Sequence, residues 1–214
     1  METEKLIDAL SADLSPAPSR QVSRGIVRVA VLGALVSLAL VIWWLGLRAD
    51  LMDAVQGPML WIKATYAALL GLGGYLALER LSRPAGTGRN GAMLAGAILV
   101  VLLAAGAFQL TTTAPGARME LWMGNSARRC PVYILLLALP LLAGTLLTLR
   151  RFAPTRLAMA GGAAGLLAGG VAATAYGLHC PETSVAFLAT WYSLGVLLST
   201  GLGAAAGPWV LRWR

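Results

Sequence analysis

Six long apolar stretches decide what this chain can fold into. They cover approximately residues 26–47, 58–78, 91–111, 131–149, 157–178 and 184–208. Each is close to the roughly 20 residues that an α-helix needs to cross the hydrocarbon core of a membrane. Only a 25-residue N-terminal segment and short loops remain outside them. We therefore expect an all-α polytopic membrane protein, with a six-helix membrane bundle over residues 26–214 and a separate segment over residues 1–25.

The basic residues are distributed unevenly along the 214 residues, whose formal net charge is +8. If the N-terminus is cytoplasmic, 12 of the 17 Lys and Arg residues fall in cytoplasmic segments. Cytoplasmic loops of membrane proteins carry such an excess of Lys and Arg. This pattern predicts a multi-pass protein of a bacterial cytoplasmic membrane, surrounded by lipid, with both termini inside. Because the charges are spread over separate loops, we expect no direct contact with nucleic acid.

The N-terminal segment differs in kind from the rest of the chain. Residues 1–14 carry four acids and one lysine, and Leu6, Ile7, Leu10 and Leu14 fall on one face at helical spacing. A helix of about 12 residues is marginal in water, so its apolar face needs a partner. A membrane surface is one candidate, but helices that lie on membranes are usually rich in Lys and Arg. The acidic charge favours a basic groove on another protein.

Small residues recur at four-residue spacing in the last two stretches. Gly161, Gly165 and Gly169 lie in the fifth, and Gly203 and Gly207 lie in the sixth. Such faces let helix backbones approach closely in lipid. We expect them to pack helices within one chain, with a dimer interface as the alternative.

Lys63 is the polar residue that stands out inside an apolar stretch, about five residues into the second. A lysine near the end of a membrane helix can extend its ammonium group to the interface. The alternative is a buried ion pair with Asp50, Asp53 or Glu182, which would hold helices together or move during signalling.

The two cysteines of the chain each precede a proline. Cys130 begins the fourth apolar stretch and Cys180 follows the fifth, so both lie on the outer face in the expected topology. Pro131 and Pro181 suit the first turn of the helix that follows each cysteine. A thiol at a helix N-terminus has a lowered pKa, which favours the reactive, metal-binding thiolate.

The neighbours of Cys180 suggest a metal site. His179, the only histidine of the chain, and Glu182 could join Cys130 and Cys180 as ligands of a soft divalent ion. The same cysteines could instead form a permanent structural disulfide or remain inert thiols. Their spacing in the sequence does not choose among these alternatives.

Nothing in the sequence indicates an enzyme. No hydrolase-like constellation of serine, cysteine or carboxylate is visible, and the chain has no CxxC pair of the kind that membrane dithiol oxidoreductases use. The rival to a regulatory role is a small membrane transporter or a thiol-redox membrane protein that uses Lys63 and the two cysteines.

Several segments together resemble proteins of the NrsF type. In chain order they are LIDALSADLSP, PMLWIKATY, RRCP, RRFAPTR, LHCPE followed by FLATWY, and the terminal LRWR. NrsF-type proteins are six-span membrane proteins described as anti-sigma factors of extracytoplasmic-function sigma factors. The resemblance runs over essentially the whole chain, and the two Cys-Pro steps are its most specific part.

The resemblance implies a mechanism. In that family the cytoplasmic N-terminal segment holds a sigma factor at the membrane, and two periplasmic-side cysteines sense heavy-metal or oxidative stress. Carried over to this chain, it assigns sensing to Cys130 and Cys180. It assigns sigma-factor binding to Leu6, Ile7, Asp8, Leu10, Asp13 and Leu14. It implies no resident cofactor beyond a soft metal ion bound transiently at the cysteines, and the oligomeric state stays open.

Overall fold

The computed structural model describes residues 2–12, 19–83, 86–152 and 154–212, and these residues form helices and loops without a strand. The predicted all-α class is therefore confirmed over this part of the chain. Each of the six apolar stretches forms a long helical element. These are α2 (Ser19–Leu40) with the π-helical turn η1 (Val41–Leu45), α4 (Pro58–Leu81), α5 (Arg89–Thr112), α7 (Cys130–Leu149), α8 (Leu157–Tyr176), and α9 (Val185–Phe187) continued by η3 (Leu188–Tyr192) and α10 (Ser193–Val210).

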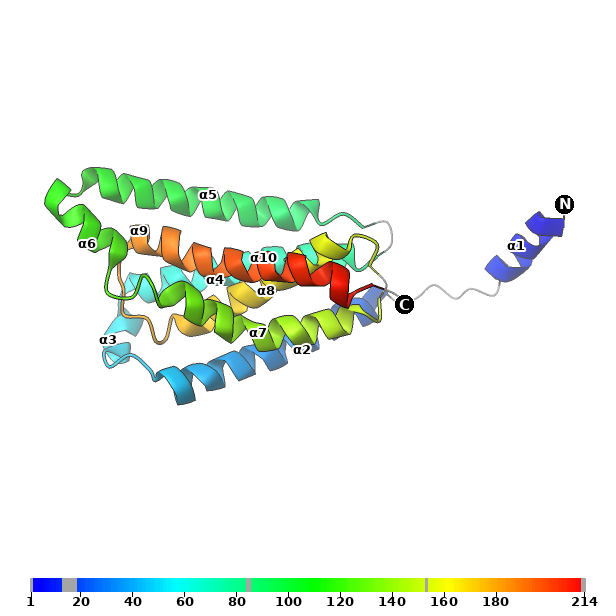
Figure 1. Cartoon of the computed structure of the whole chain (residues 1–214), viewed down its shortest axis with the longest axis horizontal. Coiled ribbons are helices and arrows are strands. Elements are labelled where there is room, and N and C mark those ends of the chain that lie inside the picture. Colours follow the sequence, from blue (N-terminus) through cyan, green and yellow to red (C-terminus); the bar gives the residue numbers. More distant parts are fainter. Residues whose placement is uncertain (1, 13–18, 84–85, 153, 213–214) are drawn as a thin grey trace.

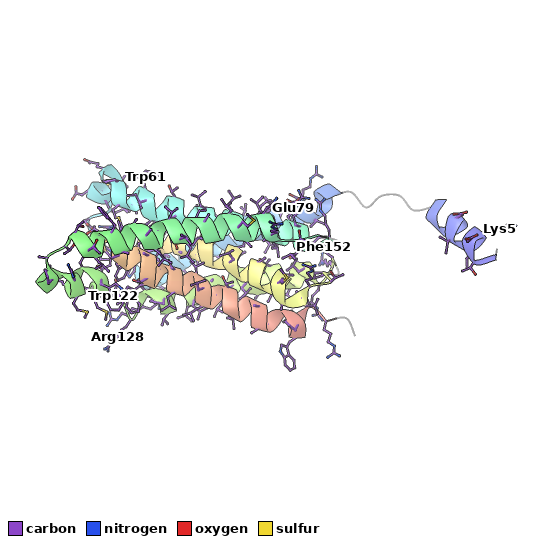
Figure 2. All side chains as sticks on the ribbon, turned by 90° about the horizontal axis from the view of Figure 1, so that it is seen from above. Lys5, Trp61, Glu79, Trp122, Arg128 and Phe152 are labelled. Atoms are coloured by element: carbon purple, nitrogen blue, oxygen red, sulfur yellow. The ribbon has the colours of Figure 1, made fainter. Side chains whose placement is uncertain are left out.

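Short helices lie outside these six elements. They are α1 (Glu2–Ala12), α3 (Leu51–Gln56), η2 (Pro115–Ala117) and α6 (Arg118–Met123). The long helices lie side by side in one bundle, with α3 and α6 at one end and the start of α2 at the other (Figure 1). We call the end with α3 and α6 the loop end; it contains Trp61, Trp122 and Arg128 (Figure 2). The opposite end, called the terminal end, contains Glu79 and Phe152.

Five helices of the described residues are long and apolar enough to cross a membrane. They are Val22–Leu45, Arg89–Thr112, Cys130–Leu149, Leu157–Tyr176 and Val185–Val210. The sixth long helix, α4, has 24 residues and packs between α5 and α8, but it carries Lys63, Glu79 and Arg80. The sixth span and the cytoplasmic termini stay predictions. Because α2 begins at Ser19, the expected division between residues 25 and 26 falls inside this helix.

The centre of the bundle is α8, which packs against α2, α4, α7 and α10. Its contacts are backbone to backbone. A Cβ atom added to Gly161 would overlap the carbonyl oxygen of Gly203 on α10, and one added to Gly170 would overlap Gly71 on α4. Helices can approach this closely only where side chains are absent. The prediction that these glycine faces pack helices within one chain is confirmed.

Replacing Gly161 by leucine is expected to destabilise the bundle by about 3 kcal/mol, the upper part of the range for an added side chain, because the obstacle is backbone. Thermal unfolding in detergent micelles measures the loss. Gly201→Leu is the matched control, since no atom lies within 4 Å of a Cβ placed at this position of α10. Equal unfolding temperatures for the two variants would contradict the packing described above.

The helix α1 stands clear of the bundle, beyond the terminal end (Figures 1 and 2). Leu6 and Ile7 are each 59% exposed, so the apolar residues of this helix are not covered by the rest of the chain. Leu10 also belongs to α1, as predicted, but the structure does not describe its side chain. Asp13 and Leu14 lie outside the described residues. The short amphipathic helix thus exists, and the described part of its apolar face is unpartnered.

Candidate functional site

The two cysteines lie at the loop end of the bundle, where α7 begins and α8 ends. Cys130 is the first residue of α7, and its backbone N–H donates to the carbonyl of Ser126 at 2.8 Å. Pro131 occupies the first turn of α7, as expected. Both thiols are free and both are fully buried, at 0% exposure. The two cysteines thus share one end of the molecule, and neither thiol is exposed to solvent.

The expectation for Pro181 is wrong. Cys180 lies in the turn that follows α8, and its N–H donates to the carbonyl of Tyr176, the last residue of the helix, at 3.1 Å. The next helix begins only at Val185, where the Ser184 hydroxyl accepts a hydrogen bond from the Phe187 N–H. Of the two cysteines, only Cys130 therefore lies at a helix N-terminus, and the argument from a helix N-terminus does not apply to Cys180, which follows α8.

Two tyrosines lie beside the thiols. The Tyr176 hydroxyl lies near the thiol of Cys130, and the buried Tyr192 hydroxyl lies near Cys180 without a hydrogen-bond partner among the described residues. The two rings pack against each other with centroids 5.7 Å apart. We call these four residues the cysteine site.

Lys63 points into the cysteine site from α4. Its side chain is 1% exposed, its Nζ donates to the carbonyl of Cys180 at 3.0 Å, and it lies 5.8 Å from the centroid of the Tyr192 ring. Neither expectation for Lys63 holds. The ammonium group is buried by the protein, and no carboxylate of the described residues forms an ion pair with it.

Two of the three carboxylates expected near Lys63, Glu182 and Asp50, form hydrogen bonds with other residues. Glu182 accepts hydrogen bonds from the backbone N–H of Asn125 at 2.8 Å and the hydroxyl of Ser126 at 2.9 Å, which ties the residues after α8 to those before α7. Asp50 receives two hydrogen bonds from the guanidinium of Arg48, at 2.7 and 2.6 Å. The Cys180 carbonyl is therefore the acceptor that fixes Lys63.

Arg48 is the functional candidate that sequence reasoning missed. Its Nη1 donates to the Cys180 carbonyl at 3.3 Å, and its backbone N–H donates to the Leu178 carbonyl at 3.1 Å. The hydrogen bonds from Arg48 lower the pKa of Asp50 to about 2, so this carboxylate is ionised throughout the physiological range. The Arg-x-Asp spacing after a long apolar stretch is only a weak signal of a functional arginine. It does not predict that Arg48 contacts the backbone carbonyl of Cys180, 132 residues away.

His179, the expected metal ligand, contacts a backbone carbonyl and an aromatic ring. Its Nδ1 lies 2.8 Å from the carbonyl oxygen of Gly46, and its ring packs on Tyr176 with centroids 5.6 Å apart. Over the residues that the structure describes, no three His, Cys, Asp or Glu side chains gather as a metal would require. A soft ion held by the two thiolates, with or without His179, stays a prediction.

Comparison with known proteins gives the chain its family. The family described as "Negative regulator of sigma F", NrsF, matches residues 10–213. The "Anti-sigma-F factor NrsF" of Caulobacter vibrioides (strain NA1000 / CB15N) is 50% identical over the full length of both chains. The "Probable anti-sigma-F factor NrsF" of Azospira oryzae is 36% identical, again over both full lengths. No solved structure matches the chain. With both relatives aligned from end to end, the chain belongs to the NrsF family of negative regulators of sigma F.

Proposed function

We propose that this protein is a membrane-bound anti-sigma factor that holds an extracytoplasmic-function sigma factor through residues 1–25. The observation that carries the proposal is α1, whose Leu6 and Ile7 are exposed on a helix that stands clear of the bundle. The names of the relatives indicate a sigma factor as the partner, and the extracytoplasmic-function class is what the family resemblance implies. The acidic residues around the apolar positions suit a basic groove on that partner.

The topology that this function requires has six spans in the bacterial cytoplasmic membrane and both termini in the cytoplasm. The start of α2 and the end of α10 lie at the same end of the bundle, which supports it (Figure 1). As the sixth span, α4 keeps its one deep charge away from lipid, because Lys63 is buried against α8 and its following turn. Glu79 lies at the terminal end, where a charge can meet water (Figure 2).

The cysteine site is the sensor in this proposal. An oxidant would take two electrons from the thiols of Cys130 and Cys180, two protons would leave, and one S–S bond would form. A soft divalent ion would instead displace the two protons and join the thiolates. Either product links the start of α7 to the end of α8. The alternative of a transporter gains no support from Lys63, whose ammonium group is hydrogen-bonded to backbone and buried.

A binding measurement tests the proposed partner. A peptide of residues 1–25 is titrated into a sigma factor of the sigma F type, and binding is followed by fluorescence anisotropy. We expect saturable binding in the micromolar range, a typical value for a short helix that must order on its partner (about −8 kcal/mol). The full-length protein in detergent micelles is titrated in parallel. If neither the peptide nor the full-length protein binds the sigma factor, the proposed function fails. If only the full-length protein binds, the sigma-binding surface lies outside residues 1–25.

A further inference from the structure

The cysteine site and the proposed sigma-binding helix lie at opposite ends of the molecule, and one element runs between them. Cys130 and Cys180 are at the loop end, whereas α1 lies beyond the terminal end (Figure 1). The helix α2 is separated from α1 by six residues and extends through η1 to the loop end. The following inference rests on the proposed function and concerns how a reaction at the thiols reaches α1.

The loop end of α2 is bonded to the turn that contains Cys180. Three hydrogen bonds join residues 46–48 to residues 178–180. The Arg48 guanidinium and backbone N–H donate to the carbonyls of Cys180 and Leu178, and His179 Nδ1 lies within hydrogen-bond distance of the Gly46 carbonyl. Among the described residues 41–50, the Arg48 guanidinium is the side chain that bonds directly to a cysteine of the site. Asp50 orients the guanidinium by accepting hydrogen bonds from its Nε and Nη2.

Along its length α2 packs mainly on α7, the helix that begins with Cys130. A Cβ atom at Gly33 would lie 2.7 Å from the Cβ of Leu141, so the two helices are in close contact there. The Ser37 hydroxyl, fully buried, donates to the Leu137 carbonyl at 3.1 Å. Nearer the terminal end, Gly25 faces Phe152. A shift of α2 at its loop end must therefore change this contact with α7 over several turns.

We propose that Arg48 is the positioning residue that couples the cysteine site to α2. Joining Cys130 to Cys180 draws the turn at residues 178–180 towards the start of α7. Arg48 moves with the Cys180 carbonyl and displaces the loop end of α2 against α7. The helix carries this displacement to Ser19, next to the segment that presents α1. Lys63 holds the same carbonyl from α4, so the turn keeps its resting position when Arg48 is absent.

The test separates reaction at the thiols from release of the sigma factor. Full-length Arg48→Gln is compared with the wild type in cells exposed to diamide, a thiol oxidant. The thiol state of Cys130 and Cys180 is read by maleimide mass labelling after denaturation, and release is read from a sigma-dependent reporter. We expect the variant to keep the reporter silent without oxidant and to oxidise as the wild type does. Its induction should fall by about five-fold or more, the lower limit of typical coupling between sites.

Two further variants distinguish coupling from general damage. Arg48→Lys keeps one donor for the Cys180 carbonyl and should restore part of the induction. Arg128→Gln is the matched control, because Arg128 is an exposed arginine at the same end (Figure 2), and it should respond as the wild type does.

Three results would overturn the inference: full induction of Arg48→Gln, release without oxidant, or thiols that no longer oxidise. If instead the wild-type protein responds without oxidation of either cysteine, the proposed sensor fails, and the role of Arg48 fails with it.

Discussion

Replacing both Leu6 and Ile7 by aspartate is expected to raise sigma-dependent transcription without any inducer, to the level of a strain that lacks the protein. Both side chains are exposed on α1 and available to a partner. Burying them in a groove contributes about 2–4 kcal/mol together, and its loss weakens binding by roughly 30-fold or more. A reporter fused to a sigma-dependent promoter measures the effect.

Lys5→Glu is the control for this prediction, because it changes the net charge of α1 by the same two units as the double substitution. At about 3.6 residues per turn, Lys5 lies on the face away from the Leu6–Ile7 stripe. Lys5 is exposed and lies far from the bundle (Figure 2). We expect this variant to keep the promoter silent. If the Leu6→Asp/Ile7→Asp protein is present in the membrane at normal amounts and still keeps the promoter silent, α1 is not the sigma-binding element.

The long helices could be predicted from the sequence because membrane-spanning helices are set by local composition and length. All six apolar stretches coincide with helical elements, within a few residues at most ends. The glycine faces were also predictable, since glycines at four-residue spacing lie on one face of a helix. In the structure a Cβ atom at Gly161 or Gly165 would overlap backbone oxygens of α10. Both predictions rest on properties that do not depend on the details of the loops.

The details of the cysteine site could not be predicted in this way. Lys63 and Arg48 both donate to the carbonyl of Cys180. Every residue has a backbone carbonyl, so the residue type does not indicate which carbonyl a distant side chain will bind. The burial of both thiols depends on how the loops before α7 and after α8 fold over each other, through Glu182 and Ser126. One local signal contradicted the expectation for Pro181: Ser184 is a favoured N-cap residue, and together with the apolar stretch from residue 184 it places the start of the last long helix after Pro181.

Replacing either Cys130 or Cys180 by serine is expected to abolish induction by both diamide and Cd²⁺, while the promoter stays silent without them. Each reaction joins two sulfurs, so the loss of one removes the product entirely. The sigma factor stays bound because α1 lies far from the site. Reporter activity with and without each reagent, together with the amount of protein in the membrane, measures the effect.

Cys→Ala variants are needed beside the serine variants because both thiols are fully buried. A serine hydroxyl left without a hydrogen-bond partner at such a site costs about 1–3 kcal/mol, and alanine avoids this cost. Loss of induction in both series, at unchanged protein amounts, assigns the response to the sulfur atoms and not to a weakened bundle. If the Cys130→Ala/Cys180→Ala protein still responds to both reagents, the thiols are structural, and the sensor must be sought elsewhere in the chain.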